Sequence, residues 1–185
     1  NSKLYRQMLL VFAEELKKNA PEIKVVAGWG CNMWWDDWMP WKVLYKPIID
    51  EAHHLIDGIC EHHYGCDVRM VAAQYEIAYT YAITNYGKSL KFYNTEVGGG
   101  ADPEQPDKFI PFNSGASPLQ NMTYTLREIM HMLCYYPDKI ETMAFHEPQY
   151  APGVLDAFLF LKELRGRLLY LDCSAKKIWT LAALE

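Results

Sequence analysis

The pattern of apolar and polar positions predicts helices and strands that alternate along the chain. Apolar residues recur on one helical face within residues 3–19, where Tyr5, Leu9, Phe12 and Leu16 follow a period near 3.6. Similar periodicity predicts helices over 41–55, 69–86, a stretch beginning at Ser117-Pro118, and about 153–164. Short apolar runs bounded by turn residues predict strands over 23–30, 55–65, 90–98 and 139–148.

The order of these elements predicts a parallel sheet, because strands that alternate with helices form βαβ units. Four such units are half of a (β/α)8 TIM barrel, which typically needs about 250 residues. After residue 165 the pattern changes to two strands joined by a polar turn. A doubly wound open sheet is the alternative, but no glycine-rich phosphate fingerprint follows any strand.

Polar and aromatic residues gather at the predicted carboxyl ends of the strands, where TIM barrels carry their active sites. The third strand ends in Glu96, within the sequence KFYNTEVGGG. Alternation along this strand predicts that Phe92, Asn94 and Glu96 share one face. Glu96 is a candidate nucleophile, general base or metal ligand, and an ordinary solvated or helix-capping carboxylate is the structural alternative.

The neighbouring strand ends supply possible partners for Glu96. His62 and Tyr64 share a predicted face of the second strand, and either could hydrogen-bond the carboxylate and keep it ionised. His146 and Glu147 end the fourth strand. Since histidines and carboxylates also bind metals, a metal-dependent enzyme using His62, Glu96 and His146 is an alternative hypothesis.

The stretch GWGCNMWWDDWMPW contains five of the six tryptophans, between Trp29 and Trp41. Their spacing is neither helical nor alternating, so a core stripe does not account for all of them. Pyranose rings stack on aromatic side chains, and amides bind their hydroxyl groups. The stretch therefore predicts a sugar site that includes Trp29, Asn32, Trp34 and Trp35, with a protein-binding patch as the alternative.

These motifs resemble the C-terminal half of the catalytic barrel in retaining glycoside hydrolases of clan A, such as agarase-like and arabinofuranosidase-like enzymes. IDGICEHHYG resembles the sixth strand of the barrel, FYNTEVGGG the seventh and ETMAFHEP the eighth. The resemblance implies strands five to eight of the barrel over residues 1–165 and the start of a β-sandwich over residues 166–185. It also implies that Glu96 is the catalytic nucleophile. Residues Trp29, Asn32, Trp34, Trp35, His62, Tyr64, Asn94, His146 and Glu147 would then bind substrate.

The chain departs from the family at its acid/base residue. In the family this is a glutamate that follows an asparagine at the end of strand four, and no Asn-Glu pair occurs here. We therefore expect that these residues lack the acid/base and that on their own they would be nearly inactive. A half barrel also has two open sheet edges, which could pair with a second copy or with the other half.

Composition narrows the class of partner. Half of the residues are apolar and the net charge is −5, which is typical of a globular protein and argues against nucleic acid as a partner. No apolar run is long enough to predict a membrane-spanning helix. Five irregularly spaced cysteines predict reduced thiols, which favours the cytoplasm but leaves the compartment open. The sequence thus predicts a glycosidase of a plant or algal polysaccharide without cofactor or metal, and a non-catalytic carbohydrate-binding fragment is a further alternative.

Overall fold

The computed structural model describes residues 1–28, 30, 32–64, 68–98, 100–101, 109–110, 117–136, 138–146, 152–169 and 182–184. The helices are α1 (Ser2–Asn19), α2 (Trp35–Pro40), the π-helical turn η1 (Trp41–Tyr45), α3 (Lys46–Ala52), α4 (Val68–Tyr86), α5 (Pro118–Tyr135) and α6 (Val154–Leu161). The strands are β1 (Val26–Ala27), β2 (Gly58–Tyr64), β3 (Lys91–Gly98), β4 (Gly100–Ala101), β5 (Phe109–Ile110), β6 (Ile140–Phe145), β7 (Arg167–Leu169) and β8 (Ala182–Leu184).

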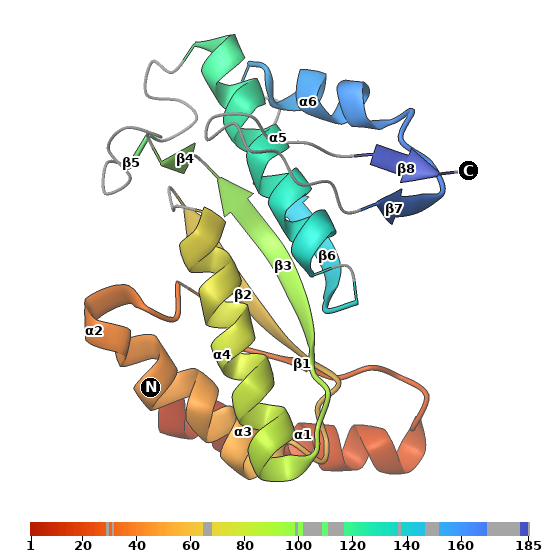
Figure 1. Cartoon of the computed structure of the whole chain (residues 1–185). Helices are drawn as coiled ribbons and strands as arrows, with labels where there is room; N and C mark the ends of the chain where they lie inside the picture. The colour runs from red at the N-terminus through yellow and green to blue at the C-terminus, as the bar shows by residue number, and fades with distance from the viewer. Residues whose placement is uncertain are drawn as a thin grey trace. The chain divides into compact units, whose positions relative to one another are not determined.

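The central feature is a four-stranded parallel sheet in the order β1-β2-β3-β6, with helices between successive strands (Figure 1). Its first pairing is parallel, with Val26 opposite Gly58 and Ala27 opposite Ile59. The predicted α/β half barrel is therefore confirmed. None of the described helices is both long enough and apolar enough to cross a membrane.

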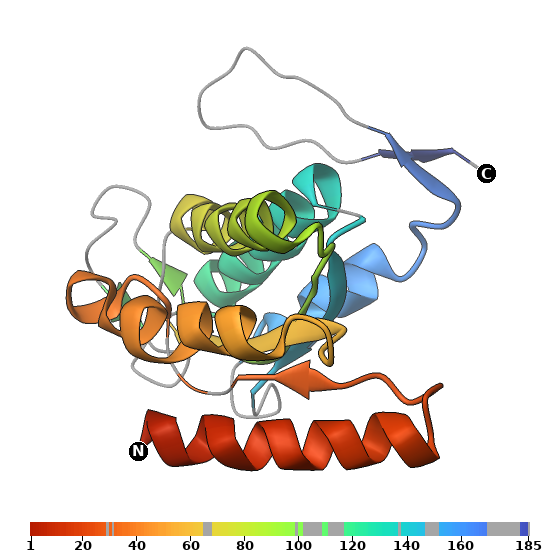
Figure 2. The same ribbon diagram turned by 90° about the horizontal axis from the view of Figure 1, so that it is seen from below.

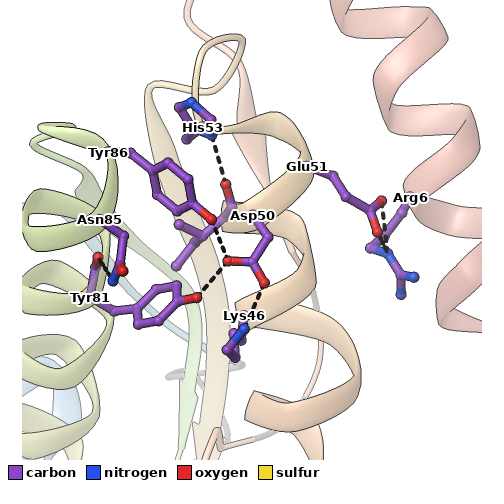
Figure 3. Close-up of polar contacts among 9 residues, drawn as sticks. Arg6, Lys46, Asp50, Glu51, His53, Tyr81, Asn85 and Tyr86 are labelled. Carbon is purple, nitrogen blue, oxygen red and sulfur yellow. Dashed lines mark hydrogen bonds and ion pairs between the residues drawn. The ribbon is translucent and has the colours of Figure 1, made fainter.

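The chain divides into two compact units, and the first contains residues 1–63, 73–96 and 141–144. Its helices α1, α3 and α4 lie one after another in Figure 2, in red, orange and yellow-green. An ion pair between Arg6 and Glu51 at 3.0 Å joins α1 to α3. Asp50 joins α3 to α4, because it accepts hydrogen bonds from Tyr81 at 2.6 Å and Tyr86 at 2.7 Å (Figure 3).

The core of this first unit is mostly apolar and lies against the sheet. Tyr75 of α4 stacks on Phe92 of β3, with ring centroids 4.6 Å apart. The other fully buried side chains include Tyr45, Ile48, Ile49, Ile56, Ile59 and Leu90. This packing holds β2 and β3 rigidly from behind, so the side chains on their opposite face are carried on a firm support.

The second unit contains residues 64–72, 97–140 and 145–185. Helix α5 begins as the sequence predicts, with a capping box in which Ser117 and Gln120 exchange hydrogen bonds and Pro118 opens the helix. Helix α6 lies beside α5, and Asn121 of α5 donates to the carbonyl of Pro152 at 2.9 Å. Strands β7 and β8 pair antiparallel, as predicted for the end of the chain.

Two local features differ from the sequence prediction. A short helix, α2, lies within the tryptophan-rich stretch, and in it Asp36, Asp37 and Trp38 have positive φ angles of 47°, 54° and 62°. Left-handed backbone at such residues costs energy and cannot be inferred from periodicity. The strands β4 and β5 form a small antiparallel pair where the sequence predicted no strand.

Candidate functional site

Glu96 of β3 and His62 of β2 face each other in the first unit. The Oε2 atom of Glu96 lies 3.5 Å from Nδ1 of His62, and both side chains are about two-thirds shielded from solvent. An imidazole at this distance orients the carboxylate. The sequence predicted this partnership, and the geometry brings the two residues together.

Thr95 holds the other side of the His62 ring, and the sequence analysis missed it. Its Oγ1 atom lies 2.9 Å from Nε2 of His62 and 3.0 Å from Sγ of Cys60. Cys60 is a free thiol. Because both ring nitrogens of His62 now have a neighbour, the orientation of the ring toward Glu96 is defined. Cys60 and His62 lie two residues apart on β2, so strand alternation places both on the face that Thr95 contacts.

Phe92 and Asn94 share the face that packs against Tyr75 of α4, as predicted, whereas Glu96 lies against His62. The prediction that all three residues share one face is therefore wrong at Glu96, and Asn94 lies away from the candidate site. Its side chain is buried and donates to Glu61 at 2.6 Å, on the side of the sheet where α4 packs. Burial alternates regularly from Lys91 to Asn94, whereas Val97 and Gly98 are both buried. The regular pleat is thus lost near the end of β3, and strict alternation no longer describes Glu96.

The chain leaves β1 through two glycines that fix its path beside β2. Gly28 has a φ of +98° and Gly30 a φ of +100°, which other residues rarely adopt. The backbone N–H of Gly28 donates to the hydroxyl of Tyr5 at 2.9 Å. The carbonyl of Gly30 accepts from the backbone N–H of His62 at 2.6 Å, so the start of the tryptophan-rich stretch is tied to the site residue itself.

The tryptophan-rich stretch is partly packed and partly exposed. Trp35 is 63% exposed, and Trp34 and Asn32 are half-buried. Trp41 instead packs edge-on against Tyr81 at 5.5 Å between ring centroids, as an ordinary structural residue. The backbone N–H of Met33, which is fully buried, donates to Oε1 of Gln74 on α4 at 2.8 Å. Trp29 lies outside the described residues.

The predicted residues of the second unit are Tyr64 and His146. Their rings meet edge-on with centroids 6.1 Å apart. The backbone N–H of His146 donates to the carbonyl of Val97 at 2.7 Å. Both side chains are exposed, as a ligand contact requires. Glu147 lies outside the described residues.

A buried polar cluster lies behind β2 and β3 and was not predicted. It consists of Glu61, His63, Tyr75 and Asn94, each no more than 2% exposed, and is called the buried clamp below. Oε1 of Glu61 lies 2.8 Å from Nδ1 of His63 and also accepts hydrogen bonds from Asn94 and the Tyr75 hydroxyl. Burial raises the pKa of the Glu61 carboxyl, but the charge of His63 and these hydrogen bonds outweigh it and bring the pKa below its usual value.

Within the described part of the chain, no group of three or more His, Cys, Asp or Glu side chains is arranged to hold a metal ion. Whereas the pair of Glu61 and His63 is buried, Glu96 and His62 form a carboxylate–imidazole pair that is partly exposed. A carboxylate so placed can act as a nucleophile or as a base.

Comparison with known proteins supports the fold. No family profile and no curated protein sequence matches the chain. Among solved structures, BuGH86 in complex with neoagarooctaose aligns over 100% of this chain and 34% of its own, with a TM-score of 0.70 and 17% identity. A monomeric β-xylosidase from Caulobacter crescentus CB15 aligns over 92% of this chain and 39% of its own, with a TM-score of 0.65 and 13% identity.

A third match is BpGH86A, a β-porphyranase of glycoside hydrolase family 86 from the human gut bacterium Bacteroides plebeius. It covers 76% of this chain and 26% of its own, with a TM-score of 0.51 and 18% identity. This chain thus spans about a third of the length of the solved structures that it matches. At these identities the likeness shows the fold alone, and the chain has the fold of a portion of a glycoside hydrolase TIM barrel.

Proposed function

We propose that the chain is part of a retaining glycoside hydrolase in which Glu96 is the nucleophile. One observation carries this proposal: the Glu96 carboxylate stands 3.5 Å from His62 near the carboxyl end of a strand, in a fold that glycoside hydrolases share. Active sites of TIM barrels are built from this end of their strands. About a third of the Glu96 side chain is exposed, which leaves its carboxylate accessible to a substrate.

The reaction proceeds in two displacements. An oxygen of Glu96 bonds to the anomeric carbon of the sugar while the glycosidic bond breaks. The electron pair of the broken glycosidic bond leaves with the departing oxygen. A second carboxyl group gives that oxygen a proton and later takes one from the water that hydrolyses the glycosyl-enzyme. His62 keeps Glu96 oriented, and Thr95 keeps the His62 ring in place.

The second carboxyl group must lie about 5–5.5 Å from the nucleophile. The 185 residues contain no Asn-Glu pair to supply it. The proposal therefore assigns no acid/base to them, and it expects them to turn over a natural polysaccharide only very slowly on their own.

The proposed substrate is a plant or algal polysaccharide. Trp34 and Trp35 offer indole faces for sugar rings, and Asn32 offers an amide for their hydroxyl groups. Tyr64 and His146 keep their predicted role as further substrate contacts. The solved structures with this fold include a complex with neoagarooctaose, a β-porphyranase and a β-xylosidase, and these substrates set the first panel to test.

The test is covalent trapping of Glu96. The full-length gene product is incubated with dinitrophenyl 2-deoxy-2-fluoro glycosides of galactose and xylose, whose leaving group needs no proton. Intact-protein mass spectrometry followed by peptide mapping should find one sugar attached to Glu96 and none in Glu96→Gln. If neither sugar labels Glu96 while both proteins remain folded, the proposed mechanism is refuted.

A non-catalytic carbohydrate-binding role is a second candidate, and it rests on the 63% exposure of Trp35. An exposed indole can bind a sugar ring without any catalytic group nearby. This candidate expects oligosaccharide binding that survives Glu96→Gln and no turnover by the intact protein. Trapping of Glu96 would contradict it.

A further inference from the structure

The buried clamp places ionisable and polar groups directly behind the site residues. Glu61 and His63 flank His62 along β2, and Asn94 lies next to Thr95 on β3. Side chains alternate between the two faces of a strand, so the clamp and the His62 site occupy opposite faces of the same backbone segments. Any shift of the clamp therefore moves the backbone that carries His62 and Thr95.

The clamp joins three elements through a single oxygen. Oε1 of Glu61 on β2 accepts a hydrogen bond from the Asn94 amide of β3 at 2.6 Å and another from the hydroxyl of Tyr75 on α4. The Asn94 amide nitrogen also lies 2.7 Å from Nδ1 of His63 and 3.2 Å from the Tyr75 oxygen. Because these contacts cross from strand to strand and from strand to helix, they fix both the register of β2 against β3 and the depth of α4.

Stability alone is a poor explanation for such a cluster. Burying an ionised carboxylate carries a desolvation cost that can exceed the Coulombic gain, and apolar residues of similar volume often serve as well or better. Oε2 of Glu61 is buried and has no hydrogen-bond partner among the described residues, which adds to that cost. A polar cluster of this kind does give one defined geometry, because its hydrogen bonds are directional.

The same helix also holds the tryptophan-rich stretch. Gln74, which precedes Tyr75, accepts the backbone N–H of Met33 at 2.8 Å, and both residues are fully buried. Met33 is adjacent to Trp34. Two consecutive residues of α4 thus reach the two parts of the site. Tyr75 contacts the strands that carry Glu96 and His62, and Gln74 contacts the stretch that carries the exposed indole of Trp35.

We propose that the buried clamp and Gln74 are positioning residues, with Tyr75 and Glu61 fixing Glu96 against His62 and Gln74 fixing the sugar-binding stretch at Met33. This inference rests on the proposed function. None of these residues touches the substrate. Their effect is on geometry, and displacements of about 1 Å away from reacting atoms can cost up to about a hundredfold in rate.

The experiment measures how the fluoro-sugar labels the full-length gene product, as a maximal labelling rate constant and a half-saturating concentration. Tyr75→Phe removes one hydroxyl and is expected to lower the rate constant about tenfold, with the half-saturating concentration within about twofold of its original value. Gln74→Met removes the acceptor for Met33 and is expected to raise the half-saturating concentration several-fold.

Tyr81→Phe is the matched control (Figure 3). It removes a tyrosine hydroxyl from the same helix, and that hydroxyl also donates to a carboxylate, the part-buried Asp50, at 2.6 Å. Tyr81 has no contact with the clamp in the described structure, so both labelling constants should stay unchanged. Equal labelling by Tyr75→Phe and Tyr81→Phe would overturn the positioning role and leave the proposed function standing.

A second variant tests the clamp in case Tyr75→Phe does not fold. Glu61→Gln keeps the shape of the side chain and an oxygen acceptor, and it is expected to lower the rate constant as Tyr75→Phe does. Amide hydrogen exchange at Thr95 and Glu96 should be faster in both variants than in Tyr81→Phe. If the protein without any substitution is not labelled at all, the proposed function fails. If amide exchange in Glu61→Gln is the same as in Tyr81→Phe, the positioning role of the clamp is overturned independently of the labelling.

Discussion

The glycine at the exit of β1 offers a sharp test of how tightly the site is built. A Cβ atom added at Gly28 would lie 2.6 Å from the backbone oxygen of Cys60 and 2.8 Å from Cε1 of Tyr45. Gly30 has nearly the same φ, yet a Cβ added there meets no atom of the described residues within 4 Å. Alanine at the two positions therefore meets the same backbone requirement and very different steric surroundings.

The expected costs follow from that difference. Holding alanine at a positive φ costs about 1–2 kcal/mol in either variant. At Gly28 the new methyl group also presses on a backbone oxygen of β2 that cannot swing aside, and overpacking of this kind adds about 1–3 kcal/mol. Gly28→Ala should then destabilise the protein by about 2–5 kcal/mol in total, against about 1–2 kcal/mol for Gly30→Ala.

Urea unfolding followed by tryptophan fluorescence measures this difference, because five of the six tryptophans lie between residues 29 and 41 of the first unit. The midpoint should fall further for Gly28→Ala than for Gly30→Ala at an unchanged slope. In thermal unfolding, each kcal/mol corresponds to about 2–4 °C for a domain of this size. Equal midpoints for the two variants would refute the argument that β1 and β2 approach each other this closely at Gly28.

Three further predictions concern charge, sugar contact and helix capping. Burial raises the pKa of Asp57, but the hydrogen bond from Lys17 at 2.8 Å helps to bring this pKa below the usual 3.8. The ionised Asp57 therefore stabilises the fold above about pH 4, and this stabilisation is lost as the pH falls further. Asp57→Asn should therefore flatten the acid side of a urea-midpoint profile. Trp35→Ala should weaken oligosaccharide binding in calorimetry with little change in stability, whereas Trp41→Ala should lower stability by roughly 2 kcal/mol. Ser117→Ala removes the cap of α5 and should cost about 1 kcal/mol in thermal unfolding followed by circular dichroism.

The sequence predicted most elements because their signals are local. The period of Tyr5, Leu9 and Leu16 defines α1, and Ser117-Pro118 marks the start of α5. The left-handed residues of α2 carry no such signal. Asp36, Asp37 and Trp38 are not glycines, so nothing in their side chains announces a positive φ.

The candidate site was predicted in part for the same reason. Glu96 and His62 were recognised as strand-end residues, and the structure brings them to 3.5 Å. Strand alternation did not single out Thr95 and grouped Asn94 with Glu96, because it cannot show where the regular pleat of β3 ends. Strand alternation specifies two faces, but tertiary packing against α4 decides which face is buried.

The opposite chemistry of the two faces of β2 leads to a last prediction. If the clamp serves geometry and not stability, replacing it with apolar residues should separate the two properties. A variant combining Glu61→Met, His63→Leu, Tyr75→Phe and Asn94→Leu removes its buried charge and every polar contact within it. The urea midpoint of this variant should equal or exceed that of the unchanged protein, because no polar group of the clamp remains to be desolvated. Labelling of Glu96 should slow by at least tenfold, because the directional contacts that fix β2 against β3 are gone. A variant that is destabilised and labels at the original rate would show the reverse, that the clamp holds the fold together and leaves the position of Glu96 to other contacts.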